Sequence, residues 1–165
     1  MPTLIEVARW AMILLVCIVL AIAGASDVRT HRIPNWTVLA MIGLFGVWFF
    51  VGFSVPLLSA LGAAIIIFIC SSSLYAFGFI GAGDSKLATA VALFAGIARL
   101  PEFILYMSLA GGVLVLCAVV AQPARALVIL RLRAKGALDK GVPYGVAIAS
   151  AGTILLLRTV MQRPL

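Results

Sequence analysis

The stretch LIEVARWAMILLVCIVLAIAGA, residues 4–25, decides the fold class. A helix needs roughly 20 mostly apolar residues to cross the hydrocarbon core of a bilayer, and this stretch is long enough. A secretory signal peptide would have a shorter apolar core and a small-x-small cleavage site after it. Glu6 and Arg9 also lie near the start of the stretch. The segment therefore predicts a membrane-spanning helix.

The composition extends this conclusion to the whole chain. Of the 165 residues, 65% are hydrophobic and 10% are charged, whereas an ordinary soluble domain is about 45–50% apolar and about 25% charged. A water-soluble chain of this length could not bury so many apolar side chains. The composition therefore excludes a soluble nucleotide-binding domain, a nucleic-acid module and a secreted disulfide scaffold. About six helices of roughly 20 residues would use most of the chain. We therefore expect an all-α polytopic membrane protein, with residues 1–165 forming one integral membrane domain and no separate soluble domain.

Five more apolar segments follow the first, separated by short polar ones. We expect helices over about 36–53, 57–79, 87–98, 102–122 and 142–157. The segment 87–98 would be only about 18 Å long as a helix, against a core of about 30 Å. Either Asp84 and Lys86 lie below the lipid surface, or this helix is partly re-entrant. The basic segment 123–141 contains an apolar stretch that suggests an interfacial helix.

The distribution of Lys and Arg predicts the orientation. Loops 26–35, 80–86 and 123–141 hold most of these residues. Cytoplasmic loops are the ones enriched in Lys and Arg, so these loops are expected in the cytoplasm and both termini outside. The net charge of +7 then reflects this bias rather than a nucleic-acid partner.

Two of the five acidic residues stand out. Glu6 and Glu102 lie at the expected outer helix ends, and Asp139 lies in the basic loop. Asp27 and Asp84 each border an apolar span on the same, cytoplasmic side. Acids at membrane depth are costly and usually face a cavity or a partner. Either aspartate alone could equally be a helix cap, but the pair also lies beside glycines that allow close backbone approach.

The other residues exclude most hydrolytic chemistries. His31 is the single histidine, so an H-E-x-x-H zinc site is impossible. The three cysteines lie in apolar runs without C-x-x-C spacing, and no G-x-S-x-G occurs. Ser85 and Lys86 are adjacent, so on a helix they would point about 100° apart and form a poor dyad. Two aspartates remain, and two carboxyl groups can share a proton and activate one water without a metal.

These residues carry a family resemblance. The segments DVRTHRIPN (27–35) and GAGDSKL (81–87) resemble the two signature segments of type IV prepilin leader peptidases, membrane aspartic proteases of the GxGD class. The segment VPYGVAIA (142–149) is similar to the Pro-aromatic-Gly opening of that family's last helix. The resemblance implies that Asp27 and Asp84 are the catalytic pair. The supporting motif residues it implies are Gly81, Gly83, Lys86, Arg32, Pro34 and Asn35.

The resemblance also implies the substrates and the setting. These are prepilins and pseudopilins, with a short basic leader, a Gly before the cut and then an apolar helix. It implies no cofactor or metal, no nucleic-acid partner and contact with membrane lipid. The chain looks like the small single-domain form of bacterial tight-adherence (Flp) pilus systems in the inner membrane, with an archaeal system as the alternative. It lacks the cysteine-bearing cytoplasmic segment of bifunctional members, so N-methyltransferase activity is not expected.

The expected helix ends suggest proton roles for the two acids. Asp84 would begin a helix, where the dipole is positive and Lys86 is near, and Asp27 would follow a helix end, where the dipole is negative. This favours ionised Asp84 as the water-activating base and protonated Asp27 as its partner. Lys86 could instead be a membrane anchor.

Two other functions compete with the peptidase. A small membrane transporter or channel would also carry intramembrane acids and Gly-broken helices, although here both acids lie at one face. A non-catalytic subunit of a secretion machine would carry the same motifs and tolerate loss of both carboxylates.

Overall fold

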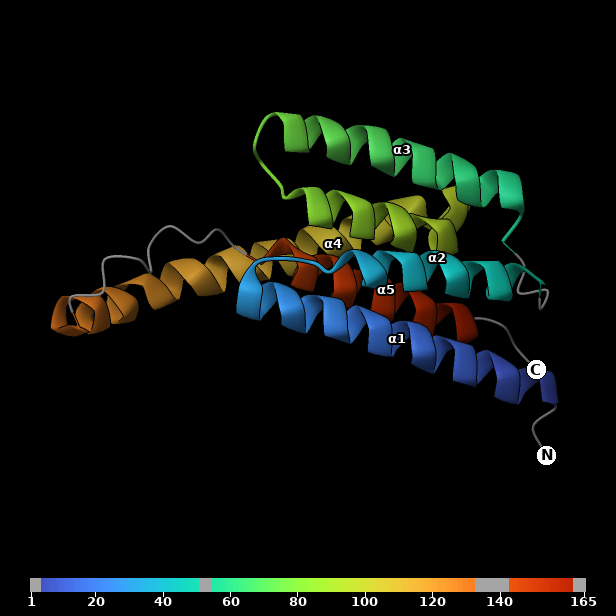
Figure 1. Cartoon of the computed structure of the whole chain (residues 1–165), viewed down its shortest axis with the longest axis horizontal. Coiled ribbons are helices and arrows are strands. Elements are labelled where there is room, and N and C mark those ends of the chain that lie inside the picture. Colours follow the sequence, from blue (N-terminus) through green and yellow to red (C-terminus); the bar gives the residue numbers. More distant parts are fainter. Residues whose placement is uncertain (1–3, 51–54, 133–142, 162–165) are drawn as a thin grey trace.

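The computed structural model describes residues 4–50, 55–132 and 143–161, and within them the protein is entirely helical (Figure 1). The predicted all-α class is confirmed. The helices, in chain order, are α1 (Leu4–Thr30), α2 (Asn35–Phe50), α3 (Leu57–Ala76), α4 (Ala82–Leu132) and α5 (Tyr144–Met161).

Helix α4 is two helical arms joined at Gly96. The backbone there has φ 61° and ψ 175°, a region that is essentially restricted to glycine. Figure 1 shows the chain folding back at this point. The two helices predicted over 87–98 and 102–122 are therefore the arms of one element, here called the first arm (82–95) and the second arm (97–132). The backbone N–H of Ile97, just after the break, donates a hydrogen bond to Ser59 Oγ on α3 at 2.9 Å.

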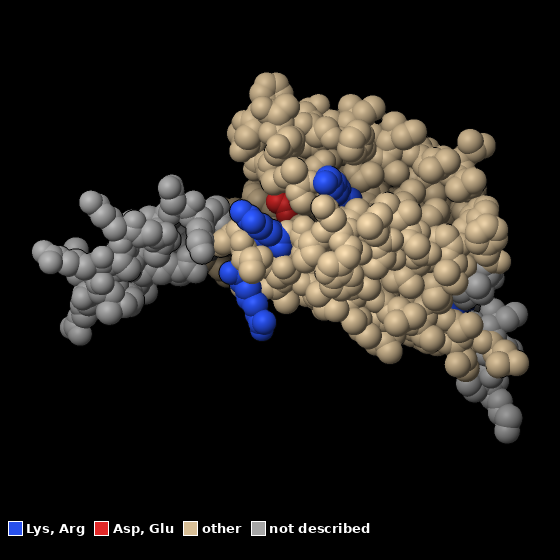
Figure 2. Space-filling view, in the orientation of Figure 1, with Lys and Arg blue, Asp and Glu red and all other residues tan. Residues whose placement is uncertain are grey.

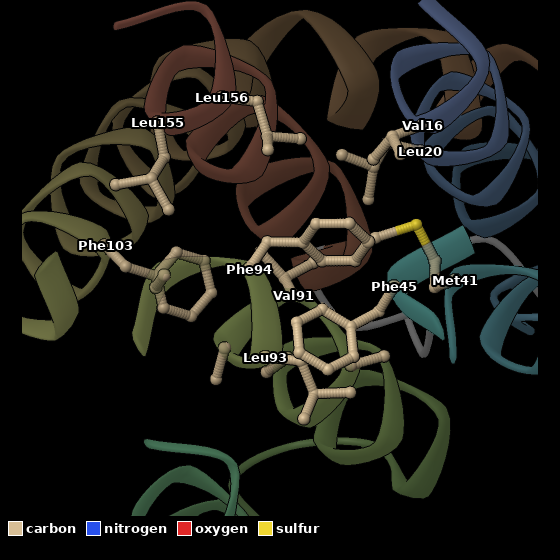
Figure 3. Close-up of a cluster of buried hydrophobic side chains, with 14 of the residues drawn as sticks. Val16, Leu20, Met41, Phe45, Val91, Leu93, Phe94, Phe103, Leu155 and Leu156 are labelled. Atoms are coloured by element: carbon tan, nitrogen blue, oxygen red, sulfur yellow. The ribbon is translucent and has the colours of Figure 1, made fainter. Parts of the chain in front are cut away.

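The first arm is the centre of the molecule. Almost every side chain from Leu87 to Ala95 is buried. Figure 3 shows Val91 and Phe94 enclosed by side chains from α1, α2, α5 and the second arm. Phe94 makes edge-to-face contacts with Phe45 and Trp48 of α2, at centroid distances of 5.4 and 5.9 Å. A helix that is apolar on all sides is expected in the interior of a protein. The apolar run of the first arm can therefore be shorter than a full membrane span, because protein rather than lipid surrounds it.

The outer surface is apolar. Leu14, Ile65 and Leu116 are about half exposed or more, together with many other large aliphatic and aromatic side chains. Among the described residues, the segments Glu6–Thr30, Leu57–Ala76 and Ala82–Cys117 are by length and composition apolar enough to cross a membrane, and α2 and α5 are shorter apolar helices. The segment Ala82–Cys117 includes the reversal at Gly96, so its length is divided between the two arms of α4. These helices indicate a membrane protein, while the count of six spans stays a prediction.

Several helix ends differ from the predicted ones. Helix α1 continues beyond Ala25 to Thr30, so Asp27 lies within its last turn rather than after it. Helix α3 ends at Ala76, because the turn through Gly78 (φ 78°) begins there. The first arm begins at Ala82, five residues earlier than expected. The second arm runs on through Leu132, and the rest of the basic segment, 133–141, lies outside the described residues.

Connections at one end of the bundle bring the important segments together. The α1–α2 turn, the α3–α4 turn and the start of α5 lie at the same end, and α1 begins and α5 ends at the other (Figure 1). The loops 26–35 and 80–86, which the charge pattern placed on one side, therefore do share one side of the molecule.

The break at Gly96 gives a stability prediction. A Cβ at this position would lie 2.7 Å from Val55 Cγ1 and 2.9 Å from Ser59 Oγ, and the backbone angles would be strained. Gly96→Ala is expected to destabilise the protein by about 1–3 kcal/mol, measured as a lower unfolding midpoint in detergent. Gly112→Ala is the control, since a Cβ there meets open space. Equal midpoints for the two variants would contradict this account of the break.

Candidate active site

Asp27 is a buried carboxylate near the end of α1, with only 5% of its surface exposed. Its Oδ2 accepts a hydrogen bond of 2.7 Å from the backbone N–H of Gly145. Gly145 is in the first turn of α5, where backbone N–H groups lack partners within the helix. The start of the last helix therefore binds the acid that the first helix carries.

Only a glycine fits at the α5 end of this contact. A Cβ on Gly145 would lie 2.8 Å from Asp27 Oδ2 and 3.0 Å from both Asp27 Cβ and Cγ. Sequence reasoning noted the Pro-Tyr-Gly opening of this helix but did not include Gly145 among the site residues. The sequence did contain a signal for Gly145, which comes two residues after Pro143 at a predicted helix start. The free backbone N–H groups of a helix start are donors that a buried acid can use.

Asp84 lies in the first turn of α4 and is held by its own helix start. Its Oδ2 accepts a hydrogen bond of 3.2 Å from the backbone N–H of Gly81, just before the helix. This is the back-bonding half of a capping box. The other oxygen, Oδ1, is buried and has no hydrogen-bond partner within the part of the chain that the structure describes. Since an unpaired buried acceptor is costly, Oδ1 is the natural contact for a water or a substrate.

Asp27, in the last turn of α1, and Asp84, in the first turn of α4, lie at the same end of the bundle (Figure 1). In Figure 2 the acidic atoms visible on this face lie in a recess beside basic side chains, over the end where α1 ends and α4 begins. Carboxyl groups 57 positions apart in the sequence (84 − 27) are thereby placed at the same end of the bundle.

The segments around the aspartates are in direct contact. A Cβ on Gly83 would lie 3.1 Å from Ile33 Cβ and 3.5 Å from the Ile33 backbone nitrogen, so Gly83 lets the α1–α2 turn reach the first turn of α4. Lys86 Nζ donates a hydrogen bond to Asn35 Oδ1 at 3.4 Å. Lys86 and Asn35 therefore link the two motifs.

The remaining motif residues shape the backbone. The Arg32 carbonyl accepts a hydrogen bond of 2.9 Å from Ser26 Oγ, and the Pro34 carbonyl accepts one of 2.7 Å from Thr37 Oγ1. The Arg32 side chain itself is exposed. Gly81 and Gly83 do not have left-handed backbone angles; the positive-φ glycines in the described segments are Gly78 and Gly96. What Gly83 provides is therefore space rather than an unusual conformation.

A buried pair of hydroxyl groups, which sequence reasoning missed, fixes α4 beside Asp84. Ser85 Oγ and Ser71 Oγ of α3 lie 2.7 Å apart and are both buried. The pair joins the residue after Asp84 to α3. The sequence gives little sign of this pair, because Ser71 is simply a serine near the end of an apolar helix.

The structure changes the argument for the proton roles. That argument counted only the negative end of α1 near Asp27, but Asp27 also faces the positive end of α5 through Gly145. Asp84 faces the positive end of α4. Each carboxyl group thus has a helix N-terminal donor, and the helix dipoles do not separate the two roles.

The donor set at this site consists of carboxylates. No group of three or more His, Cys, Asp or Glu side chains suited to a metal occurs among residues 4–50, 55–132 and 143–161. Cys17 is partly buried, Cys70 and Cys117 are exposed, and all three are free thiols.

Comparison with known proteins identifies the family. The model of the type IV leader peptidase family matches residues 14–116, which is more than half of the chain. The chain therefore belongs to the type IV leader peptidase family, as its motifs suggested, and is a peptidase by family. Searches of curated proteins and of solved structures gave no match. The matched range includes both aspartates and stops before α5, so the Gly145 contact comes from the structure alone.

The contact between Gly145 and Asp27 gives a prediction about activity. Gly145→Ala pushes a methyl group against the Asp27 carboxyl, and displacement of a reacting group by about 1 Å can cost about a hundredfold in rate. We expect a loss of that order in leader cleavage by the purified, folded protein. Gly43→Ala, where a Cβ meets open space, is the matched control and should retain full activity. Full activity in Gly145→Ala would show that the contact does not position Asp27.

Proposed function

We propose that this protein is an aspartic endopeptidase that removes the leader peptide of type IV prepilins and pseudopilins at the cytoplasmic boundary of the membrane, cutting after a glycine. The observation that carries the proposal is the arrangement of Asp27 and Asp84. They come from different helices, lie at the same end of the bundle, and each has one oxygen bound by a backbone N–H at a helix start.

The two carboxyl groups have the parts that peptide hydrolysis needs. Two neighbouring carboxyl groups hold one proton between them, because both cannot ionise at low cost. The ionised group removes a proton from a water as the water attacks the carbonyl carbon of the glycine. The protonated group donates a hydrogen bond to the carbonyl oxygen. When the C–N bond breaks, a proton passes to the leaving nitrogen, and the products are a carboxylate and a new amino terminus.

The hydrogen bonds at the site favour this geometry. A backbone N–H binds Oδ2 of each aspartate and so restricts where each carboxyl group can lie. The unpartnered Oδ1 of Asp84 is then available for the water. A pair arranged in this way titrates as a unit, so the base and the acid belong to the pair rather than to one residue.

The setting follows from charge and from the family. Exposed basic residues, Arg29, Arg32 and Lys86, lie at the end of the bundle that carries the aspartates. The positive-inside bias places this end of the bundle in the cytoplasm in our proposal. The proposed location of the protein is the bacterial inner membrane, which its helices cross several times. We propose an Flp-type pilin as the substrate, an archaeal prepilin as the alternative, and cleavage without N-methylation.

The competing functions have less support. A transporter would need a polar path across the molecule, but beyond Asp84 the side chains of the first arm from Leu87 to Ala95 are almost all apolar and buried. A non-catalytic assembly subunit would have no use for a costly buried acceptor such as Asp84 Oδ1.

The central test is loss of cleavage. Co-expression with a candidate prepilin is expected to yield processed pilin with the native protein. Asp27→Asn and Asp84→Asn should each abolish processing, because an amide can neither take up the proton nor share it. Asp139→Asn, the acid that the sequence assigns to the basic loop, is the control and should process normally. Processing by either site variant would refute the carboxyl pair.

Metal removal gives an independent test of the mechanism. Since the proposed chemistry uses two carboxyl groups and one water, treatment of the purified protein with EDTA is expected to leave the cleavage rate unchanged. Loss of activity on EDTA treatment, restored by adding a divalent cation, would contradict the mechanism without contradicting the family.

A further inference from the structure

An open apolar groove lies between α1 and α5, which are neighbours in the bundle (Figure 1). Its volume is about 430 Å³. Small side chains make up much of its lining: Ala21, Gly24 and Ala25 from α1, and Ala149 and Ser150 from α5.

The groove lies beside a close contact between α1 and α5, where small side chains leave space unfilled. A Cβ on Gly24 would lie 3.4 Å from Ala149 Cβ and 3.7 Å from Val146 Cα, so the helices are in van der Waals contact there. Ala21 and Ala25 are exposed beside this contact and have no bulk to fill the space next to it. Leu20 and Ile154 line the groove farther along the two helices.

One end of the groove adjoins the candidate active site. Val28 of α1 and Val146 of α5 are lining residues, and each directly follows a site residue, Asp27 or Gly145. From Leu20 to Val28 the groove follows α1 for about 12 Å, or roughly two helical turns. A polypeptide that leaves the aspartates toward the middle of the bundle can follow this groove.

The lining suits an occupant without free polar groups. The two hydroxyl side chains in the groove are already used, because Ser150 Oγ donates to the Ala147 carbonyl at 3.0 Å and Thr153 Oγ1 donates to the Ala149 carbonyl at 2.9 Å. A transmembrane helix has satisfied its backbone groups internally. Surfaces of Gly, Ala and Ser are those on which two such helices pack closely.

We propose that the groove between α1 and α5 binds the first two turns of the apolar helix that follows the cleavage site in the prepilin. This inference rests on the proposed function and adds a recognition site to it. A helix seated in the groove would present the residues just before it to Asp27 and Asp84. The groove would thus set the distance between the cut and the start of the substrate helix.

The test is to fill the groove away from the aspartates. Ala21→Trp places a large ring in it six residues from Asp27, and Ala11→Trp, at an exposed alanine of α1 outside the groove, is the matched control. With purified protein and full-length prepilin in lipid vesicles, Ala21→Trp should raise KM about tenfold with little change in kcat. Ala11→Trp should match the native protein. Native kinetics for Ala21→Trp would overturn the groove while leaving the peptidase intact, whereas absence of Asp27-dependent cleavage by the native protein would refute the proposed function itself.

Photo-crosslinking keeps the proposal testable if the tryptophan variant does not fold. We would place p-benzoylphenylalanine at position 21 or 11 in otherwise native protein and irradiate it with prepilin in vesicles. The proposal expects an adduct with the prepilin, mapped to the first turns of its apolar helix, from position 21 and not from position 11. Adducts from position 21 only with lipid or with a second copy of this chain, or no adduct, would overturn it.

Discussion

A carboxylate in an apolar helical bundle needs hydrogen-bond donors, and at Asp27 that requirement links the two ends of the chain. Transfer of an unpaired carboxylate into such surroundings is strongly unfavourable. The N–H of Gly145, 118 positions later, meets Asp27 Oδ2 at 2.7 Å. Because this bond runs from the last turn of α1 to the first turn of α5, it joins the end of the first of these helices to the start of the other. The groove beside them is left open by the small residues over which the two helices pack.

Asp84 reaches the same end of the bundle through a different constraint. Its arm of α4 is the buried centre of the molecule, and the chain must then reverse to form the second arm. The glycine-only angles at Gly96 allow this reversal without a loop. The Ser71–Ser85 hydrogen bond and the close contact of Gly83 with Ile33 fix the start of the arm. The position of Asp84 therefore depends on packing along the entire arm.

The all-helical class and the two aspartates were predictable from the sequence because hydropathy and residue chemistry are local signals. Asp27 and Asp84 stood out as acids beside apolar runs, and their motifs matched a family. A break between the helices 87–98 and 102–122 was predicted, but its position at Gly96 was not, since one glycine among apolar residues looks like any other in a helix. Gly145 and Ser71 were missed because each acts through a residue far away in the sequence. The helix ends were wrong where a polar residue such as Asp27 continues a helix instead of ending it.

The aspartates and the residues of α5 that contact Asp27 or line the groove lie in different parts of the sequence. This separation bears on how the protein could select its substrate. The family match covers residues 14–116, which contain both aspartates, while the donor to Asp27 and one wall of the groove come from α5 beyond that range. A change at Gly145 alters the chemistry directly, because its N–H contacts the carboxylate. Ser150, in contrast, lines the proposed substrate groove and makes no hydrogen bond to either aspartate. On the proposed function, α5 holds Asp27 with its first turn and lines the substrate groove with the residues that follow, so the two tasks fall on different residues of one helix.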